Sequence, residues 1–324
     1  MGTAGPRGHE QEIMAEITPA AVEDLFRRQF EVWPMAKSNF DALKGVEVKE
    51  FDLDGLHIKV QFNPARMVSS AAKVDKASLA ARKCFLCAEN RPDVQEGIDW
   101  NDRYTVLINP FPIFPRHLTI PDKGHVDQLI DSRIADMAAL AMTLEGYTVF
   151  YNGPRCGASA PDHMHFQAGN SDFLTLGDAL EDTELQTIAT EGDSTLALAD
   201  KLPLKVFVID ADTPEEAQKL FGRLYAALPE GEDSPEPMMN ILAYATPKGV
   251  RIVVIPRKRH RPSFYGMEGE GKMVISPASV DMGGVFITPR PQDFAAFDAD
   301  LARRIYDELC LTNDEARAIA ENIR

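Results

Sequence analysis

Asn152-Gly-Pro-Arg-Cys-Gly-Ala-Ser-Ala-Pro-Asp-His-Met-His-Phe-Gln167 is the most informative stretch of this chain. Its last five residues alternate in polarity, which predicts a strand with His163, His165 and Gln167 on one face. Two imidazoles and an amide make a poor core, because each needs a polar partner once it is buried. A solvated strand face would explain the same pattern, and the histidines alone do not separate the two interpretations.

The loop before the histidines favours a functional site. Gly157, Ala158 and Ser159 offer backbone N–H groups and a hydroxyl immediately before the predicted strand, and such groups can form a nest for phosphate oxygens. A nucleophilic imidazole beside a phosphate cradle is the arrangement of phosphoryl and nucleotidyl transfer.

The residues on either side predict an α+β fold in which the sheets are largely antiparallel. Residues 15–45 have a helical pattern that Thr18 caps and Pro19 opens, the usual signals of a helix start. Farther along, strand patterns alternate with a helix and with turn sequences. The predicted strands are 46–51, 56–62, 104–108, 117–121, 148–151 and 163–167, and a second helix is predicted at 126–146.

The second half of the chain repeats this order of elements. It predicts strands at 204–209, 240–244, 250–255 and 284–288, helices at 214–227 and 292–309, and an acidic linker at 229–237. Segment 117–125 also resembles segment 252–260. We therefore expect two related lobes, 15–200 and 201–324, of which the second is degenerate because it lacks the reactive histidines. This one pair of segments leaves a true duplication open.

Bulk composition narrows the function. The 324 residues include 34 basic and 50 acidic side chains, a formal charge of −16, which disfavours general nucleic-acid binding. A local group of arginines can still bind a small anion. No run of about 18 apolar residues predicts a membrane span. Residues 1–14 have the composition of a flexible tail without the apolar core of a secretory signal, so we expect a cytoplasmic protein, which could form a homodimer.

Four cysteines are present, Cys84, Cys87, Cys156 and Cys310. Without a secretory signal, the close pair Cys84-Phe-Leu-Cys87 indicates a metal or redox site rather than a structural disulfide. Two buried thiols in a turn are the alternative.

Together these motifs resemble the transferase branch of the histidine-triad superfamily. That branch holds galactose-1-phosphate uridylyltransferase, diadenosine tetraphosphate phosphorylase and GDP-L-galactose phosphorylase. The resemblance rests first on His-x-His-x-Gln after an Asn-Gly turn and a Gly-x-Ser loop. In the hydrolase branch the third position is histidine, so glutamine implies transfer to an acceptor other than water. The resemblance extends, in order, over Phe62–Arg66, Cys84–Arg91, Val106–Pro112, Asn240–Leu242, Val253–Pro256 and Gly283–Phe286.

The resemblance implies a role for each polar residue of this loop and strand. His165 would be the nucleophile that becomes nucleotidylated, and Gln167 would hydrogen-bond its phosphate. Ser159 and the backbone N–H groups before it would hold phosphate oxygens, while Asn152 would orient the loop or the nucleophilic ring. The chemistry agrees, because a neutral imidazole is a nucleophile near neutral pH and an amide cannot activate water as a general base.

The resemblance also implies a structural zinc ion held by Cys84, Cys87, His117 and His163. Two thiolates and two imidazoles can form a closed tetrahedral site. His125 is the rival third ligand, with a surface role as its alternative.

Substrate contacts are implied for Arg66, Asn109 and Arg155, although each arginine could equally be a surface residue. The loop departs from the family at Pro154–Cys156, so the base and the sugar of the substrate stay open. His260 lies in the only dense basic run, 257–261. It is either the end of a solvated strand or part of an acceptor-phosphate site.

The resulting hypothesis is a nucleotidyltransferase or phosphorylase that works by double displacement. A nucleoside diphosphate sugar or a dinucleoside polyphosphate would donate its nucleotidyl group to His165, and phosphate or a sugar phosphate would accept it. Similarity of the second half to the phosphorylases favours phosphate. The alternatives are a hexose-1-phosphate nucleotidylyltransferase and a nucleotide-binding regulator without turnover. A DNA-end deadenylating protein is disfavoured by the charge of −16.

Overall fold

The computed structural model describes residues 17–64, 78, 79, 81–231 and 233–323. The predicted tail at 1–14 and the candidate Arg66 lie outside the described residues. Within them, no helix is long and apolar enough to cross a membrane.

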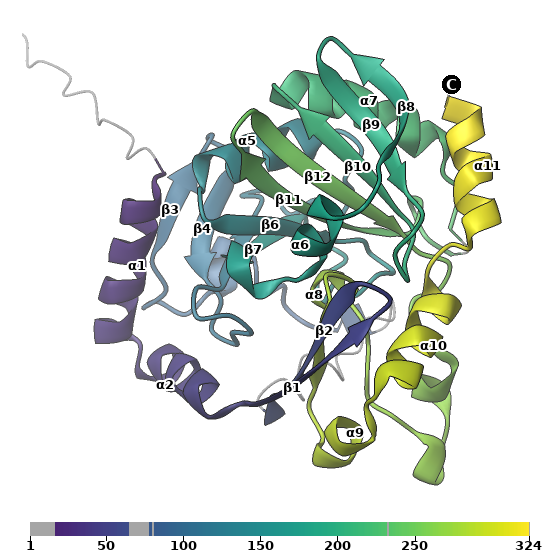
Figure 1. Ribbon diagram of the computed structural model, residues 1–324. Coiled ribbons are helices and arrows are strands. Elements are labelled where there is room, and N and C mark those ends of the chain that lie inside the picture. Colours follow the sequence, from purple (N-terminus) through teal and green to yellow (C-terminus); the bar gives the residue numbers. More distant parts are fainter. Residues whose placement is uncertain (1–16, 65–77, 80, 232, 324) are drawn as a thin grey trace, which may run out of the picture.

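The described strands and helices form an α+β fold (Figure 1). The strands are β1 (Glu47–Leu53), β2 (Leu56–Phe62), β3 (Gly97–Trp100), β4 (Tyr104–Ile108), β5 (Leu118–Pro121), β6 (Tyr147–Asn152), β7 (His165–Asn170), β8 (Gln186–Glu191), β9 (Ser194–Ala199), β10 (Val206–Ala211), β11 (Met239–Thr246), β12 (Gly249–Pro256) and β13 (Val285–Thr288). The helices are α1 (Pro19–Val32), α2 (Pro34–Ala42), α5 (Ile134–Thr143), α6 (Leu176–Glu181), α7 (Pro214–Ala227), α8 (Ser279–Met282), α9 (Pro291–Ala296), α10 (Ala299–Leu309) and α11 (Asn313–Ile323).

One large sheet runs through both halves of the described chain. Its ten strands lie in the order β3-β4-β5-β7-β6-β11-β12-β10-β9-β8. The two halves meet where β6 pairs antiparallel with β11, and every neighbouring pair in this sheet is antiparallel. The prediction of an α+β fold with largely antiparallel sheets is confirmed.

The order of the strands reveals an internal repeat. In each half, three strands are followed by a helix, α5 or α7, and then by two more strands. The five strands occupy the same relative places in the sheet, β3-β4-β5-β7-β6 in the first half and β8-β9-β10-β12-β11 in the second. The second half of the sheet thus begins at β8, before residue 200.

The sequence similarity that suggested two lobes does not follow this repeat. Segment 117–125 contains β5, whereas segment 252–260 contains the end of β12. β5 is the third strand of its half and β12 is the fifth, so the two segments occupy different positions. The repeat is therefore evident in the topology, not in this pair of segments.

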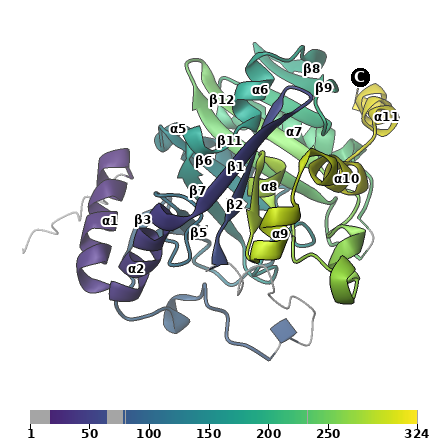
Figure 2. The same ribbon diagram turned by 60° about the horizontal axis from the view of Figure 1, so that its bottom comes forward.

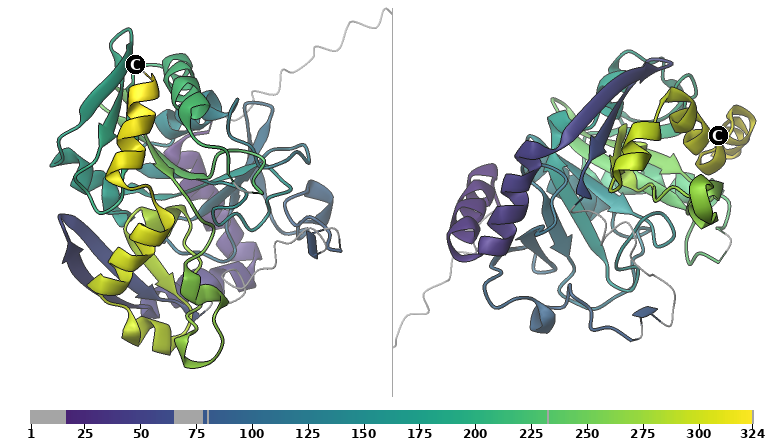
Figure 3. Two further views of the ribbon diagram at one scale, coloured as in Figure 1. Left: turned by 90° about the vertical axis from the view of Figure 1, so that its right-hand side faces the viewer. Right: turned by 90° about the horizontal axis from the view of Figure 1, so that it is seen from below.

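The two faces of the large sheet are covered differently. One face packs on α1, α5, α7 and α11. The other packs on α6, α8, α10 and a small sheet in which β2 lies between β1 and β13. Figure 2 shows the hairpin of β1 and β2 and helix α10 in front of the large sheet. Figure 3 shows α10 and α11 following one another along one side of the molecule.

Strand alternation decides on which face the candidate site lies. Phe166 and Ala168 of β7 are buried in the core beneath the helices α1, α5 and α7. Successive side chains of a strand point to opposite faces, so His165 and Gln167 lie on the face toward the small sheet.

Several predicted helices are shorter than their patterns suggested. The pattern at 15–45 is divided at Pro34, which begins α2; proline is favoured at a helix start because it has no N–H to donate. The predicted helix 292–309 is divided into α9 and α10, whose cap Asp298 accepts a hydrogen bond from the backbone of Leu301. Only Ile134–Thr143 of the predicted helix 126–146 is helical. Strands β3, β8 and β9 and helices α6, α8 and α11 were not predicted.

A buried carboxyl group holds the non-helical part of segment 126–146 in place. Glu236, only 3% exposed, accepts hydrogen bonds from the Ile130 backbone N–H (2.9 Å) and the Tyr151 hydroxyl (2.5 Å). Burial raises the pKa of the Glu236 carboxyl to about 7. Glu236 thus joins the approach to β11, strand β6 and the segment before α5.

Replacing Glu236 by glutamine should change the pH dependence of stability. Because the folded-state pKa is raised, ionisation of Glu236 destabilises the fold as the pH rises from the unfolded-state value through about 7. The unfolding free energy of E236Q minus that of wild type should therefore increase by on the order of 1–3 kcal/mol when the pH is raised from about 5 to about 8. Urea unfolding measures this difference, with exposed Glu230 replaced by glutamine as the control. An equal difference at both pH values would contradict the assignment.

Candidate active site

The imidazole of His165 is presented as a neutral nucleophile. Its side chain is buried at the start of β7, and its Nδ1 donates a hydrogen bond to the His163 carbonyl oxygen (2.8 Å). With the proton on Nδ1, the lone pair lies on Nε2. Burial lowers the pKa of His165 to about 4, so the ring stays neutral at neutral pH.

A buried glutamine that the sequence analysis missed holds the strand that carries the nucleophile. The ladder between β6 and β7 ends at the pair Phe150–Gln167. Beyond it, the Gln128 side-chain amide donates to the carbonyl oxygens of Asn152 and His165 (both 3.0 Å) and accepts from the His165 N–H (2.7 Å). Gln128 is fully buried, and its amide takes the place of backbone pairing where the two strands separate.

The orientation of Gln167 is fixed by His117. The Ile113 N–H donates to Nδ1 of His117 (3.1 Å), so the ring proton lies on Nε2 and is donated to the Gln167 carbonyl oxygen (2.9 Å). Asn109 also approaches that oxygen, at 3.5 Å. Because the oxygen of Gln167 is engaged, its NH2 group is the one that can donate to a phosphate.

The loop from Asn152 to Ser159 is anchored by the second half of the chain. The Asn152 side-chain oxygen accepts hydrogen bonds from the backbone N–H (2.8 Å) and the hydroxyl (2.8 Å) of Ser279 and from the Asn240 amide (3.1 Å). Asn240 also donates to the Cys156 carbonyl oxygen (2.8 Å). Asn240 and Ser279 were not predicted as site residues, although an asparagine within an apolar strand is an unusual buried group.

Glycine is required at position 157 of this loop. Its φ of +98° is in the left-handed region, and a Cβ there would lie 2.5 Å from the Ala278 Cβ. No acceptor among the described residues takes the N–H groups of Gly157, Ala158 or Ser159. These donors lie in the loop that leads into β7, the strand of His165, and such N–H groups can form a cradle for phosphate oxygens.

Two thiols and two imidazoles gather beside this loop. The ligand atoms of Cys84, Cys87, His125 and His163 all lie within 4.8 Å of one another. Cys84 Sγ is 3.3 Å and Cys87 Sγ 3.6 Å from His163 Nδ1, and Cys87 Sγ is 3.2 Å from His125 Nδ1. Sulfur and nitrogen ligands of tetrahedral zinc lie about 3.5 Å apart. The four residues therefore fit a metal ion.

The surroundings of the cluster also fit a metal site. His163 Nε2 donates to the Asp122 carbonyl oxygen (2.8 Å), which leaves Nδ1 free to face the thiols, as outer hydrogen bonds do for metal-bound histidines. Burial and the neighbouring Cys84 raise the pKa of the Cys87 thiol to about 11. A cation would offset the cost of ionising these two adjacent thiols.

The structure places the rival His125 in the cluster and His117, the predicted third ligand, outside it. Both ring nitrogens of His117 are engaged, by Ile113 and by Gln167. His117 directly precedes strand β5, which pairs with β7, so its side chain contacts Gln167 of β7 and not the thiols. The segment after β5 brings His125 to them, with its ring 5.1 Å from that of His163.

Three further polar side chains, of Asn90, Arg91 and Arg82, hold the cysteine loop. Arg91 Nε donates to the Leu86 carbonyl oxygen (2.9 Å) and Asn90 to that of Cys84 (3.0 Å). Arg82 donates to the Ser159 carbonyl oxygen (3.1 Å). The cysteine loop is thus tied directly to the phosphate cradle.

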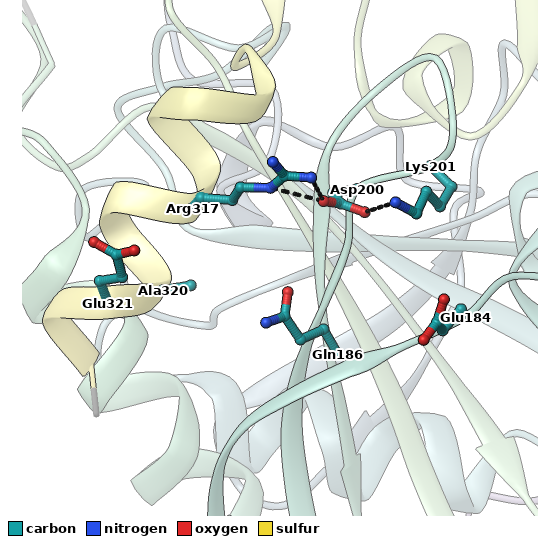
Figure 4. Close-up of a pocket in the computed structure, with 7 residues that line it drawn as sticks. All are labelled: Glu184, Gln186, Asp200, Lys201, Arg317, Ala320 and Glu321. Atoms are coloured by element: carbon teal, nitrogen blue, oxygen red, sulfur yellow. Dashed lines mark hydrogen bonds and ion pairs between the residues drawn. The ribbon is translucent and has the colours of Figure 1, made fainter.

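A separate hollow of about 470 Å³ lies against α11 and contains none of the residues above (Figure 4). Its central carboxylate, Asp200, accepts a hydrogen bond from Arg317 (2.6 Å) and pairs with Lys201 (3.5 Å). Because this charge is already balanced within the hollow, we do not place the chemistry there.

Two family models together match most of the chain. Residues 25–170 match a domain of unknown function, DUF4922, and residues 182–324 match a GDPGP1-like, C-terminal domain. Nothing among curated protein sequences matches significantly. The fold is similar to that of yeast Ap4A phosphorylase Apa2, at 20% identity over 86% of this chain and 94% of that one, with a TM-score of 0.56.

The same yeast protein with its ligands matches equally well. In complex with Ap4A it is 17% identical over 86% of this chain and 97% of that one, with a TM-score of 0.55. In complex with AMP it is 20% identical over 87% and 96%, also with a TM-score of 0.55. The second half of the chain thus matches a GDPGP1-like C-terminal domain, and the fold of the described chain is that of the yeast Ap4A phosphorylase.

The second half of the chain has no counterpart of the candidate residues His165 and Gln167. The pair Phe150–Leu242 lies at the middle of the ladder between β6 and β11. Phe150 also pairs with Gln167 of β7, and Leu242 pairs with Val253 of β12. Gln167 therefore corresponds to Val253, and His165, two residues before Gln167, corresponds to Arg251. Arg251 is bound by Asp210, with Nε at 2.7 Å from the carboxylate. An arginine and a valine cannot form a nucleotidyl-histidine, so the equivalent positions of the second half carry no candidate nucleophile.

Metal analysis distinguishes the two candidate third ligands. Protein purified without chelator should contain about one metal ion per chain, and His125→Ala and Cys84→Ser should lose metal and melt at a lower temperature. His117→Gln should keep its metal, because His117 contacts Gln167 and not the thiols. Loss of metal from His117→Gln, or full occupancy in His125→Ala, would overturn this ligand set.

Proposed function

We propose that the chain catalyses nucleotidyl transfer by double displacement, with phosphate as the acceptor. The observation that carries this proposal is the free Nε2 of His165 on the strand that follows a loop whose backbone N–H groups at 157–159 have no acceptor in the described chain. A nucleophile next to a phosphate cradle suits attack on an α-phosphate.

In the first step, Nε2 of His165 attacks the α-phosphorus of the donor. The bond between that phosphorus and the bridging oxygen breaks, and the leaving phosphate takes the electron pair. The ring becomes a cation, which the hydrogen bond from Nδ1 to the His163 carbonyl oxygen stabilises (2.8 Å). In the second step, an oxygen of inorganic phosphate attacks the same phosphorus and releases neutral His165 and a nucleoside diphosphate.

Gln167 supports transfer to phosphate over hydrolysis. Its carbonyl oxygen is held by His117 (2.9 Å), so its NH2 group can bind a phosphate oxygen in both steps. An amide neither takes a proton from water nor gives one to a leaving group. The covalent intermediate therefore survives until a better nucleophile arrives.

The donor is proposed to be a dinucleoside polyphosphate or a nucleoside diphosphate sugar. Similarity in fold to a yeast Ap4A phosphorylase, whose structures include complexes with Ap4A and AMP, supports the former. The match to a GDPGP1-like domain supports a nucleoside diphosphate sugar as the donor. Transfer to a hexose 1-phosphate is the second candidate, which the same assay tests with a different acceptor.

Zinc is the metal that we propose for Cys84, Cys87, His125 and His163, because two thiolates and two imidazoles form a closed site. The ion would supply no open position for catalysis. Its ligand His163 carries the carbonyl oxygen that orients His165, so the ion would position the nucleophile indirectly.

Product analysis tests this function. Wild-type protein, inorganic phosphate and a panel of dinucleoside polyphosphates and nucleoside diphosphate sugars should yield nucleoside diphosphate. Gln167→His introduces a titratable group and should raise the ratio of monophosphate, the hydrolysis product, to diphosphate. Lack of turnover of every donor would contradict the function. An unchanged product ratio in an active Gln167→His variant would contradict the role given to Gln167.

A further inference from the structure

Three arginines gather beside the phosphate cradle without carboxylate partners. Arg155 belongs to the cradle loop itself, and Arg257 and Arg261 follow strand β12. Among the described residues, no aspartate or glutamate forms an ion pair with any of the three, although most other arginines of the chain have one. In a chain with a net charge of −16, such a cluster is unusual.

Each residue of segment 276–279 contacts either one of these arginines or the loop from Asn152 to Ser159. The Ser276 hydroxyl accepts from Arg261 Nε (2.8 Å), and the Pro277 carbonyl oxygen accepts from Arg257 Nη1 (3.3 Å). The next two residues contact the cradle: Ala278 packs against Gly157, and Ser279 binds Asn152. The cation cluster and the cradle are therefore parts of one continuous structure.

Arg257 is the buried member of the cluster, only 4% exposed. Its Nη1 donates to the Asn240 side-chain oxygen (2.6 Å) and its Nη2 to the His260 carbonyl oxygen (3.0 Å). Its Nε is buried and has no acceptor. A buried donor without a partner is costly, and an anion at the cluster would reduce that cost.

His260 lies next to this cluster, because its carbonyl oxygen accepts a hydrogen bond from Arg257 Nη2 (3.0 Å). Burial, followed by the charges of Arg261, Arg257 and Arg155, lowers the pKa of His260 to about 3. His260 is thus neutral, and Arg155 from the first half lies close enough to act on a residue of the second half.

From this arrangement, and resting on the proposed function, we infer that Arg155 and Arg261 bind two groups in turn: the β-phosphate group of the donor, which leaves in the first step, and the inorganic phosphate that enters in the second. In both steps the group opposite His165 at the α-phosphorus is a phosphate, so the β-phosphate of the donor and the acceptor phosphate occupy the same subsite. Guanidinium groups suit it, because they present paired donors to phosphate oxygens. Arg257 acts as a positioning residue, since it holds Asn240 and through it the cradle.

An anion-binding experiment tests the subsite without turnover. In the His165→Ala background, inorganic tripolyphosphate should raise the melting temperature, and Arg155→Gln and Arg261→Gln should each weaken this binding by about tenfold or more. Arg259→Gln is the matched control. It removes the same charge from an exposed side chain of the same basic run that is not among the groups acting on His260. Arg261→Lys should restore part of the binding.

Kinetics with the active enzyme provides the second readout. The KM for inorganic phosphate should rise about tenfold or more in Arg155→Gln and Arg261→Gln and stay unchanged in Arg259→Gln. Wild-type affinity and an unchanged KM in both variants would overturn the subsite while leaving the proposed function intact. If tripolyphosphate binding depends on the two arginines but no donor is turned over, the anion site stands and the proposed function fails. Arg261→Lys gives the same test if Arg261→Gln does not fold.

Discussion

The separation of β6 from β7 is the constraint on which the site depends. Paired strands leave no room for a ligand, and strands that separate leave backbone groups that must be satisfied. The Gln128 amide solves this by binding the carbonyl oxygens of Asn152 and His165 and the His165 N–H. With those groups satisfied, the loop between the two strands can form a cradle whose N–H groups remain available to a phosphate.

The second half of the chain is a structural part of the candidate site. Its strand β12 carries Arg251 at the position that corresponds to His165. Its strand β11 nevertheless pairs with β6 and brings Asn240 to Asn152, and the segment before β13 brings Ser279 there. The first half thus carries the candidate residues His165 and Gln167, and the second half holds the loop that precedes them in place.

Sequence reasoning predicted what is local in the chain. The loop and strand at 152–167 and the pair Cys84 and Cys87 are short motifs whose residues lie together in space, and the α+β class follows from periodicity. Gln128 was not found, because it lies in a segment with a helical pattern and its partners are 24 and 37 residues away. The exchange of His125 for His117 has the same cause: both flank one strand, and only the tertiary structure shows which end meets the thiols.

Intact-mass spectrometry of the protein incubated with donor in the absence of phosphate tests the central claim most directly. The account predicts a mass increase of one nucleoside monophosphate, located on His165, labile to acid and absent from His165→Ala. His163 should not react, because its Nδ1 faces the two thiols and its Nε2 is bonded to the Asp122 carbonyl oxygen. An adduct on another residue, or turnover retained by His165→Ala, would contradict the account.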